Sequence, residues 1–596
     1  MSPFEIVSAE LMDPKSVADE FVEEYTENTK ISSHAHTIVW GSRGSGKSMH
    51  FKYLEPLAQA WCPKLNYKGD VKRFILNKDS YVGVYINCRE GILNREELKI
   101  LSSQPEIDEV FLHLIFSRYL SSVILFKLTN TFLEQLKWIL NISIDWRSLP
   151  RWLQKSIKKN TKSIKSLLKE LNSKCVEWIA EINDIIDGLF LSENISDVKK
   201  KFPSECPRLT SDLIDFCVYV QKKTNIEVPF FLLFDEANEL ADIHQYCVNS
   251  LIALRSQKHI CIKVASQRNG FIIGRTLTGD VDETHDFTTL DIDALYTNNR
   301  EAYYKRILQI GNYRLTRAGI NDSVKNYLPP SQKEIEELEK AKKIAEERYN
   351  SIPIKKRPLD KNNYVKKYAP SILFQDILSS KAIKTYAGFD NLVHLSSGII
   401  RSFLDCTSKM YSKYQEKYPG KKPQYIPISI QAEVIKEYSD EFIQTQILDK
   451  MKSIDPNSKE MANLQKLHNL LNGLGAFFRR RLLDKESSEP RIISISLKDL
   501  PDSHLQEILD LAEQEAFFHT KWYISKRGNR KLKCYVLNRR LCPHFNLDLT
   551  GFQGRIEIDS RTLETCLTDP NTFVKIMSVK HLKKVDNQIQ LEIFNW

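Results

Sequence analysis

A glycine-rich stretch limits what this chain can fold into more than any other part of its sequence. It runs from Gly41 to Ser48, reads GSRGSGKS and matches the pattern G-x-x-x-x-G-K-[ST]. The apolar run Thr37–Trp40 comes before it, and apolar residues at helical spacing follow from Met49 to about Trp61. In this order of strand, loop and helix, backbone N–H groups curl around phosphate oxygens, and the positive end of the helix faces the same anion. The stretch therefore predicts a phosphate-binding loop, or P-loop.

Every residue of this loop is assigned to nucleotide binding, and the last two also have specific roles. Lys47 would neutralise the β- and γ-phosphates of ATP, and the Ser48 hydroxyl would ligate Mg²⁺. The alternative is a chance match in a turn rich in glycine and serine, but the flanking strand and helix favour the P-loop. The predicted ATP contacts are Gly41, Ser42, Arg43, Gly44, Ser45, Gly46, Lys47 and Ser48.

Two acidic residues end a second apolar run. Val228–Phe234 contains no polar side chain and is followed by Asp235 and Glu236. A buried parallel strand that delivers carboxylates to its carboxyl end has this pattern. Asp235 would hold the water shell of Mg²⁺, and Glu236 would orient and activate the attacking water. Strands often end in acidic turns, so the pattern gains its weight from the combination with the P-loop.

A third predicted strand ends in polar residues that could reach the same site. Ile260–Ala265 is followed by Ser266 and Gln267, either of which would lie beside the two acids and contact the γ-phosphate or the attacking water. Arginines nearby could act as a finger that stabilises the transition state in a neighbouring subunit, although an ordinary surface arginine is the alternative. The candidates for this role are Arg268, Arg275 and Arg255.

Strands and helical stretches alternate in the first half of the chain. Further strands are expected at Tyr81–Asn87 and Phe287–Ile292, and helical spacing dominates from about 105 to 220. Strands separated by helical patterns predict an α/β fold with a parallel sheet covered on both faces. The predicted domains are a helical lead-in at 1–34, a nucleotide-binding core at 35–292 with a helical insertion at about 105–220, a helical lid and linker at 293–455, and a C-terminal module at 456–596.

The order of these segments resembles the AAA+ superfamily, and most closely its branch of origin-recognition and STAND-type ATPases. The resemblance covers roughly residues 35–440 and rests on the P-loop, the strand Tyr81–Asn87, the segment FLLFDEANEL and the segment FDNLVHLSSGIIRSFLDC at Phe389–Cys406. It implies a helical lid in which a Ser/Gly-rich turn precedes an arginine that senses the γ-phosphate, here Arg401. It also implies hydrolysis assisted by a second subunit, and therefore a homo-oligomer or a hetero-complex. The helical insertion is larger than the usual core carries, and no standard finger motif is present.

The pattern changes from about residue 468 onward. An amphipathic helix is expected at Leu505–Phe518, and the strands Trp522–Ile524 and Leu532–Leu537 flank a basic turn with a Gly-Asn pair, which is typical of a β-hairpin. A helix followed by a basic hairpin is similar to a winged-helix domain, which origin-recognition ATPases also carry at this end.

Basic residues concentrate in this module. Arg479–Arg481 is one group, and no acid interrupts the other, which consists of Lys521, Lys526, Arg527, Arg530, Lys531, Lys533, Arg539 and Arg540. Clustered cations attract nucleic-acid phosphates, so double-stranded DNA is a predicted partner through Lys526, Arg527, Arg530 and Lys531. A protein partner is the alternative, because hairpin tips are often basic for solubility.

Composition places the chain among soluble globular proteins. Of its 596 residues, 42% are hydrophobic and 27% charged, and the formal net charge is +10. The eleven cysteines form no C-x-x-C pair, which favours a cytoplasmic protein with reduced thiols and argues against zinc. No signal peptide is expected at the N-terminus. The longest apolar run, Val110–Thr129, contains Arg118 and Lys127, so we expect a buried helix there and no membrane span.

The sequence therefore predicts an AAA+ switch protein that binds and hydrolyses ATP and couples nucleotide state to oligomer assembly and to DNA or partner engagement. The alternative is the ATPase component of a prokaryotic antiphage defence complex, which would regulate a separate effector protein. No nuclease-type acidic cluster lies outside the ATP site in the sequence and no G-x-S-x-G motif is present, so any damage would come from that effector.

Overall fold

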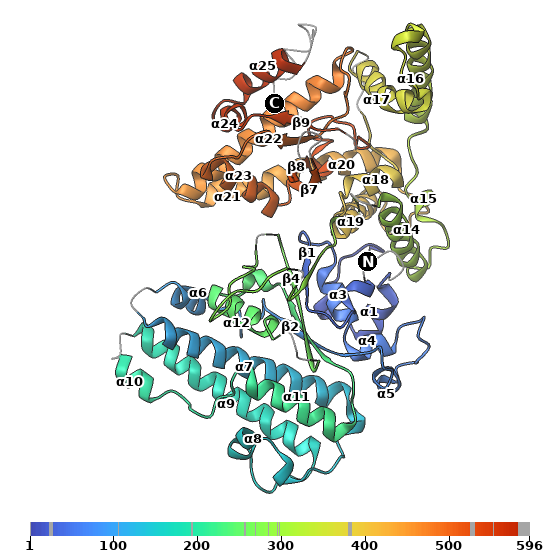
Figure 1. Ribbon diagram of the computed structural model, residues 1–596. Helices are drawn as coiled ribbons and strands as arrows, with labels where there is room; N and C mark the ends of the chain where they lie inside the picture. Colours follow the sequence, from blue (N-terminus) through green and yellow to red (C-terminus); the bar gives the residue numbers. More distant parts are fainter. Residues whose placement is uncertain are drawn as a thin grey trace. The chain divides into compact units, whose positions relative to one another are not determined.

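The computed structural model contains two compact units, each built around its own part of the chain (Figure 1). The N-terminal unit comprises Val7–Ser42 and Gly46–Ile292, and the C-terminal unit comprises Met1–Ile6, Arg43–Ser45 and Asp293–Trp596. The described residues are 2–22, 28–104, 107–191, 195–254, 258–268, 270–283, 285–294, 296, 299–379, 384–524, 531–551 and 554–581.

A five-stranded parallel sheet forms the centre of the N-terminal unit, as the sequence predicts. Its order is β2-β3-β4-β1-β5, and every neighbouring pair is parallel. β3 and β4 are buried along their whole length, because helices cover both faces of a parallel sheet. Figure 1 shows α3, α1 and α4 on one side of the strands and α12 on the other. The strands are β1 (Thr37–Trp40), β2 (Val82–Asn87), β3 (Phe230–Asp235), β4 (Ile260–Ser266) and β5 (Thr288–Asp291).

The chain before β1 and between the P-loop and β2 forms short helices. The sequence predicts one helix from Met49 to about Trp61, and this prediction is wrong: the helix ends at Tyr53 and a second one starts at Pro56. Proline fixes φ and has no N–H, so it starts a helix well but interrupts one that is already running. The helices in this part are α1 (Pro14–Glu20), α2 (Asn28–Ile31), α3 (Lys47–Tyr53), α4 (Pro56–Ala60) and α5 (Val71–Ile75).

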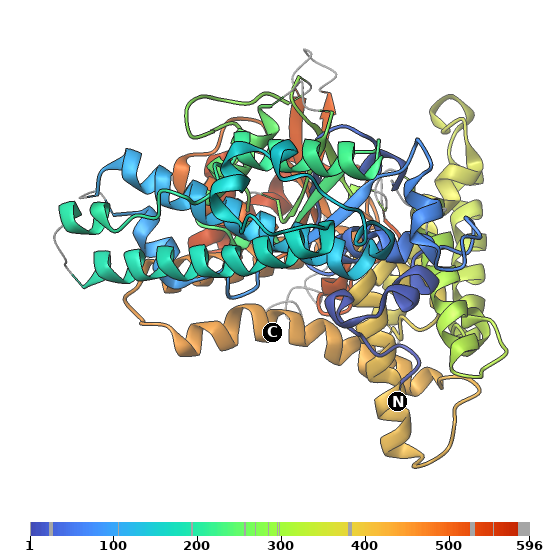
Figure 2. The same cartoon turned by 90° about the horizontal axis from the view of Figure 1, so that it is seen from below.

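Helices fill the chain between β2 and β3. The two longest, α7 and α9, lie side by side over their length (Figure 1, Figure 2). By length and composition α7 could cross a membrane, but 61% of its most apolar window is buried inside the unit, which is typical of a core helix. The helices after β2 are α6 (Glu96–Ser102), α7 (Glu109–Gln135), α8 (Arg151–Ser156), α9 (Ile164–Phe190), α10 (Ile195–Lys200) and α11 (Ser211–Thr224), and α12 (Asp242–Ile252) follows β3.

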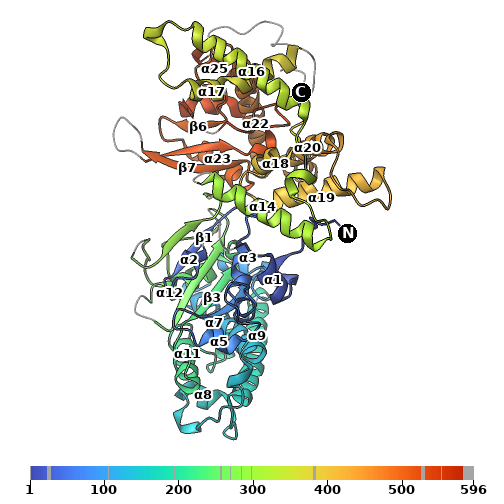
Figure 3. The same ribbon diagram turned by 90° about the vertical axis from the view of Figure 1, so that its right-hand side faces the viewer.

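The C-terminal unit is mainly helical, and one buried apolar cluster extends through it from Phe4 to Met577. α16 and α17 form a hairpin with a small core of its own, built on Ala341, Ala345 and Ala369 (Figure 3). The helices before the last module are α14 (Arg300–Arg317), α15 (Val324–Tyr327), α16 (Gln332–Ser351), α17 (Lys361–Ser379), α18 (Phe389–Leu395), α19 (Ile400–Lys417), α20 (Ile428–Ile443), a π-helical turn at Gln444–Leu448 and α21 (Asp449–Ser453).

The last module combines a mixed four-stranded sheet of order β7-β8-β6-β9 with four helices. β7 and β8 are antiparallel, as the predicted hairpin requires, but the turn 525–530 lies outside the described residues. The elements are α22 (Lys459–Leu483), β6 (Ser494–Leu497), α23 (Ser503–Gln514), β7 (Phe518–Ile524), β8 (Lys531–Leu537), β9 (Ile556–Ile558), α24 (Ser560–Thr568) and α25 (Pro570–His581).

Two details of this module differ from a winged helix that reads DNA. The predicted helix Leu505–Phe518 is too long, because the chain leaves the helix after Gln514 and Ala516 adopts a left-handed conformation with φ 60°. Between β6 and β7 the described residues therefore contain one helix, α23, whereas helix-turn-helix readout uses a second helix after a short turn. The winged-helix assignment stays a prediction.

A buried arginine links this module to the turn before α19. The backbone N–H of Arg539 donates to the hydroxyl of Ser397 over 2.7 Å. Arg539 is 1% exposed, and its guanidinium donates to the carbonyls of Leu549 and Gly551. The Ser397 turn and the last module are thus parts of one packed unit.

The packing of α22 gives a first prediction. Gly475 lies in the middle of this helix, and a Cβ atom there would come within 2.4 Å of the Phe545 ring. We expect Gly475→Ala to lower the free energy of unfolding by roughly 1–3 kcal/mol, because overpacking outweighs the gain in helix propensity. Chemical denaturation measures the change. The control is Ala462→Gly on the exposed face of the same helix, which should lose about 1 kcal/mol through propensity alone. A more stable Gly475→Ala variant would contradict the packing argument.

Candidate nucleotide site

The predicted site residues of the N-terminal unit come together at the carboxyl ends of three adjacent strands. β3 ends in Asp235, β4 ends in Ser266, and the P-loop begins directly after β1. Trp40 pairs with Ser266 in the sheet, and the N–H of Gly41 donates to the Ser266 carbonyl over 3.2 Å. Ligands of open α/β sheets bind at this edge, so the sequence-predicted residues occupy the expected place.

The P-loop has the backbone that its glycines allow. Gly44 and Gly46 have φ values of 86° and 102°, which side chains with a Cβ rarely adopt. The ammonium of Lys47 is buried and donates to the carbonyls of Gly41 and Ser42 over 2.7 and 3.1 Å. The hydroxyl of Ser45 is buried without a hydrogen-bond partner in the described chain, and a phosphate oxygen would supply one. The loop therefore fits a nucleotide phosphate.

The carboxylate of Asp235 is fully buried and held from several sides. One oxygen accepts the N–H of Glu236 over 3.0 Å, and the other accepts the hydroxyl of Tyr85 over 2.7 Å. Burial raises the pKa of Asp235 to about 6, while hydrogen bonds from Ser48 and Tyr85 act in the opposite direction. Ser48 and Asp235 thus place a hydroxyl and a carboxylate together, which is an oxygen donor set that suits Mg²⁺.

Tyr85 is a site residue that the sequence analysis missed. It lies on β2 opposite Leu233, so Tyr85 and Asp235 project from the same face of the sheet. The ammonium of Lys52 lies 4.6 Å from the centre of the Tyr85 ring and forms an ion pair with Glu55 at 2.5 Å. The one available signal was a phenol two residues before the end of β2, and nothing in the spacing connects it to Asp235.

Glu236 follows Asp235 in a strained backbone conformation. Its φ and ψ are 54° and 42°, which is the left-handed region that residues other than glycine rarely adopt. Such outliers persist where the surrounding structure enforces them, often at functional sites. The side chain is half-buried beside Asp235, and its role as the base stays a prediction.

The polar end of β4 is partly occupied by local interactions. The Ser266 hydroxyl donates to the Gln267 carbonyl over 3.0 Å, and Gln267 is half-buried. Arg268 forms an ion pair with Asp291 at the end of β5. Arg275 is exposed, 3.5 Å from Glu109 and over the ring of Tyr246. Arg255 lies outside the described residues, and the choice of a finger stays a prediction.

Arg401 is the second residue of α19. Residues Arg43–Ser45 cluster with the C-terminal unit, and within it the N–H of Arg401 donates to the Gly44 carbonyl over 3.1 Å. A Cβ on Gly44 would lie 2.5 Å from the Cβ of Arg401, so only glycine fits there. Ser397 and Gly398 before the helix have φ values of 51° and 92°. The side chain of Arg401 is exposed, and its sensor role stays a prediction.

Several basic residues that suggested DNA binding are internal. Arg540 donates to the Tyr438 carbonyl and lies over the Tyr438 ring at 3.6 Å, and Lys533 pairs with Glu513 at 2.7 Å. Arg480, Arg481 and Arg539 are buried. Lys526, Arg527 and Arg530 lie outside the described residues, as does the side chain of Lys531.

Cysteine and metal chemistry add no second site within the described residues. All eleven cysteines are buried and unpaired. No group of three or more His, Cys, Asp or Glu side chains in the described ranges could hold a metal ion.

Comparison with known proteins identifies the family of the chain. The family model ORC-CDC6-like matches residues 2–558, and the chain belongs to this family. Membership indicates an AAA+ ATPase, which uses a nucleotide together with Mg²⁺. No curated protein matches the chain. No solved structure matches it either.

The Tyr85 contact gives a second prediction. Tyr85→Phe removes the hydroxyl but keeps the ring under Lys52. Because a hydrogen bond to the charged form is lost, the pKa of Asp235 should rise further, and less carboxylate is present at pH 6.5. We expect the Mg²⁺ concentration needed for half-maximal nucleotide binding to rise roughly tenfold at pH 6.5 and less at pH 8. Titration of Mg²⁺ at both pH values tests this, with Tyr246→Phe on α12 as the control. An unchanged Mg²⁺ requirement at both pH values would show that the contact has no such role.

Proposed function

We propose that this protein is a nucleotide switch that binds ATP with Mg²⁺ and hydrolyses it. The contact of Ser48 and Tyr85 with the buried carboxylate of Asp235 carries the proposal, because it brings the P-loop and two strands to one oxygen-rich position. The P-loop amides and Lys47 would hold the phosphates. Ser48 and Asp235 would hold Mg²⁺, which supplies charge neutralisation at the phosphates.

Glu236 is the proposed base. It follows Asp235 directly and is half-buried, and its backbone is fixed by the hydrogen bond to the preceding carboxylate. A base held in this way can orient a water molecule without reorganisation. Ser266, Gln267 and Arg401 are proposed to sense the γ-phosphate, and Arg268 to serve as the finger after release from Asp291.

Nucleotide state is proposed to control assembly and the engagement of DNA or a protein partner. Cytoplasmic localisation belongs to the same proposal. A homo-oligomer or a hetero-complex would supply the second subunit that the finger requires. Contact with duplex DNA would use Lys526, Arg527, Arg530 and Lys531.

A second candidate is the ATPase component of an antiphage defence complex that controls a separate effector. The internal positions of Arg480, Arg481, Arg539 and Arg540 favour it, since these cations stabilise the fold and leave fewer charges for a DNA backbone. The two candidates share the proposed ATP hydrolysis and differ in the partner that the C-terminal module binds.

The direct test compares the wild type with Glu236→Gln. We expect the variant to bind ATP and to assemble with it, because the neutral amide keeps the shape of the side chain. Turnover should fall roughly 100-fold or more, because the base is lost. Mass measurement and turnover with and without duplex DNA provide the readout. Assembly that ignores DNA would favour the effector-regulating role. Unchanged turnover would remove Glu236 from the mechanism.

The P-loop has its own test. Lys47→Ala should weaken ATP binding by on the order of 100-fold or more, because the buried ammonium is the cation at the phosphate position. Equilibrium binding of a labelled ATP analogue measures this. Lys72→Ala, on the exposed side of α5, is the control and should bind as the wild type does. If ATP affinity survives Lys47→Ala, the P-loop assignment is wrong.

A further inference from the structure

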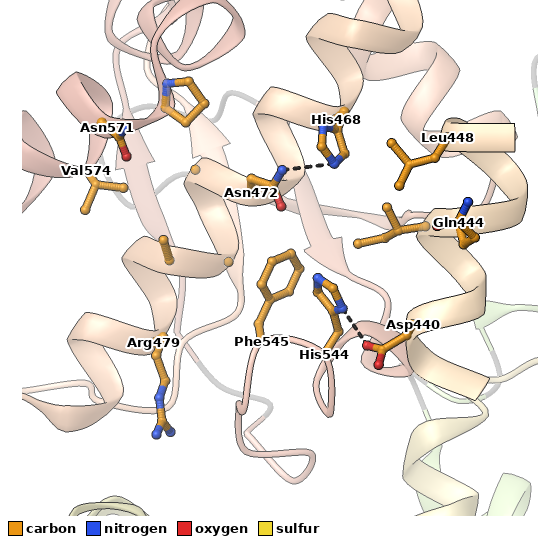
Figure 4. A pocket seen from close by; sticks show the side chains of 15 residues that line it. Asp440, Gln444, Leu448, His468, Asn472, Arg479, His544, Phe545, Asn571 and Val574 are labelled. Carbon is orange, nitrogen blue, oxygen red and sulfur yellow. Dashed lines mark hydrogen bonds and ion pairs between the residues drawn. The ribbon is translucent and has the colours of Figure 1, made fainter. Parts of the chain in front are cut away.

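The C-terminal unit contains a cavity of about 460 Å³ that takes no part in the proposed ATPase chemistry (Figure 4). Its volume lies in the range of small-molecule sites. The walls come from the end of α20 with the following π-helical turn, from the middle of α22, from the start of α25 and from the loop that carries His544 and Phe545. A π-helical turn is a rare irregularity that is frequent at functional sites, and here it contributes Gln444 and Leu448 to the wall.

Two imidazoles enter this cavity, and a hydrogen bond orients each of them. Nδ1 of His544 lies 2.7 Å from a carboxylate oxygen of Asp440, and the amide of Asn472 donates to Nε2 of His468 over 3.1 Å. Figure 4 shows the two rings coming from different elements, His468 from α22 and His544 from the loop beside Phe545. A hydrogen bond at one ring nitrogen fixes the tautomer and the direction of an imidazole, as it does in sites that hold a ligand.

The charges around the two rings favour an anion as the ligand between them. Lys436 shares the Asp440 carboxylate with His544, and these interactions lower the pKa of Asp440 although burial acts to raise it. Burial and the nearby His544 lower the pKa of His468, so its ring is neutral near pH 7. Arg479 also lines the cavity from α22, but its guanidinium points away from the two rings and donates to the carbonyl of Asn546 over 2.6 Å. An oxyanion between the rings would allow His468 to take up a proton at Nε2, with the Asn472 side chain turned so that its Oδ1 accepts from the protonated ring.

The rest of the wall is apolar. The Phe545 ring is 8% exposed and meets the His544 ring edge to face at 4.6 Å. Ile443, Leu448 and Val574 surround the same space. A flat or apolar body would bury its surface there, since aromatic and aliphatic walls with a few oriented polar groups are typical of ligand pockets.

We propose that this cavity binds a small organic anion, with its carboxylate or phosphate monoester between His468 and His544 and its flat body against Phe545. All residues of the site lie in the C-terminal unit, and the proposal is independent of the nucleotide site.

Calorimetric titration of the full chain tests the proposal, in a Lys47→Ala background that weakens binding at the P-loop. Two probes, benzoate and phenyl phosphate, combine an anionic head group with an aromatic ring. Two controls each lack one of these parts: inorganic phosphate has no aromatic ring, and benzyl alcohol has no charge. We expect benzoate or phenyl phosphate to bind with a Kd of roughly 1 mM or tighter, and the other two at least about tenfold more weakly. The stronger of the two aromatic probes identifies the head group.

Three variants locate the binding. His468→Gln and His544→Gln should each weaken it about tenfold, because a charged hydrogen bond is lost. Ala476→Phe fills the cavity without removing a polar group and should abolish it. His113→Gln on α7 is the matched control and should leave it unchanged. Binding should also take up a proton at pH 7, which titrations in buffers of different ionisation enthalpy measure.

Three outcomes would overturn the proposal. They are the absence of binding for both aromatic anions up to about 10 mM, equal affinity for benzyl alcohol, and full affinity in the Ala476→Phe variant.

Discussion

The buried carboxylate of Asp235 is the group on which the arrangement of the N-terminal unit depends. Burial of a carboxylate without partners is unfavourable, and here three segments supply them: Ser48 after the P-loop, Tyr85 on β2 and the backbone of Glu236. β2 must lie directly beside β3 for Tyr85 to reach that position, and the strand order provides this neighbour. The order of the strands and the proposed magnesium position therefore depend on each other.

The C-terminal unit depends on a different kind of buried charge. Arg539 loses its hydration, and carbonyls of Leu549 and Gly551 together with the ring of Tyr296 replace it. The same residue contacts Ser397 two residues past the end of α18. A change in the turn before Arg401 would reach the last module through this contact, without an intermediate loop.

Much of the sheet could be predicted from the sequence, because buried parallel strands leave uninterrupted apolar runs. β3 follows such a run and β1 a short one, whereas the buried Lys263 interrupts the run at β4; the P-loop follows from its glycines. The end of α23 could not be predicted, since Ala516 adopts a conformation for which glycine is the usual signal. The contact of Tyr85 with Asp235 could not be predicted, because the two residues lie 150 positions apart in the chain. The burial of Arg539 and the position of Arg540 over the Tyr438 ring could not be predicted, because a sequence shows charge but not burial.

The backbone conformation of Glu236 and its proposed chemistry favour different residues at this position. Its left-handed backbone would suit glycine or asparagine with less strain, while the proposed chemistry requires a carboxylate. Selection for thermostability alone would then replace this glutamate, and selection for turnover would retain it. With Glu236 as the proposed base, the strain at this position lowers the stability of the fold in exchange for reactivity, and more stable but inactive variants should arise there most readily.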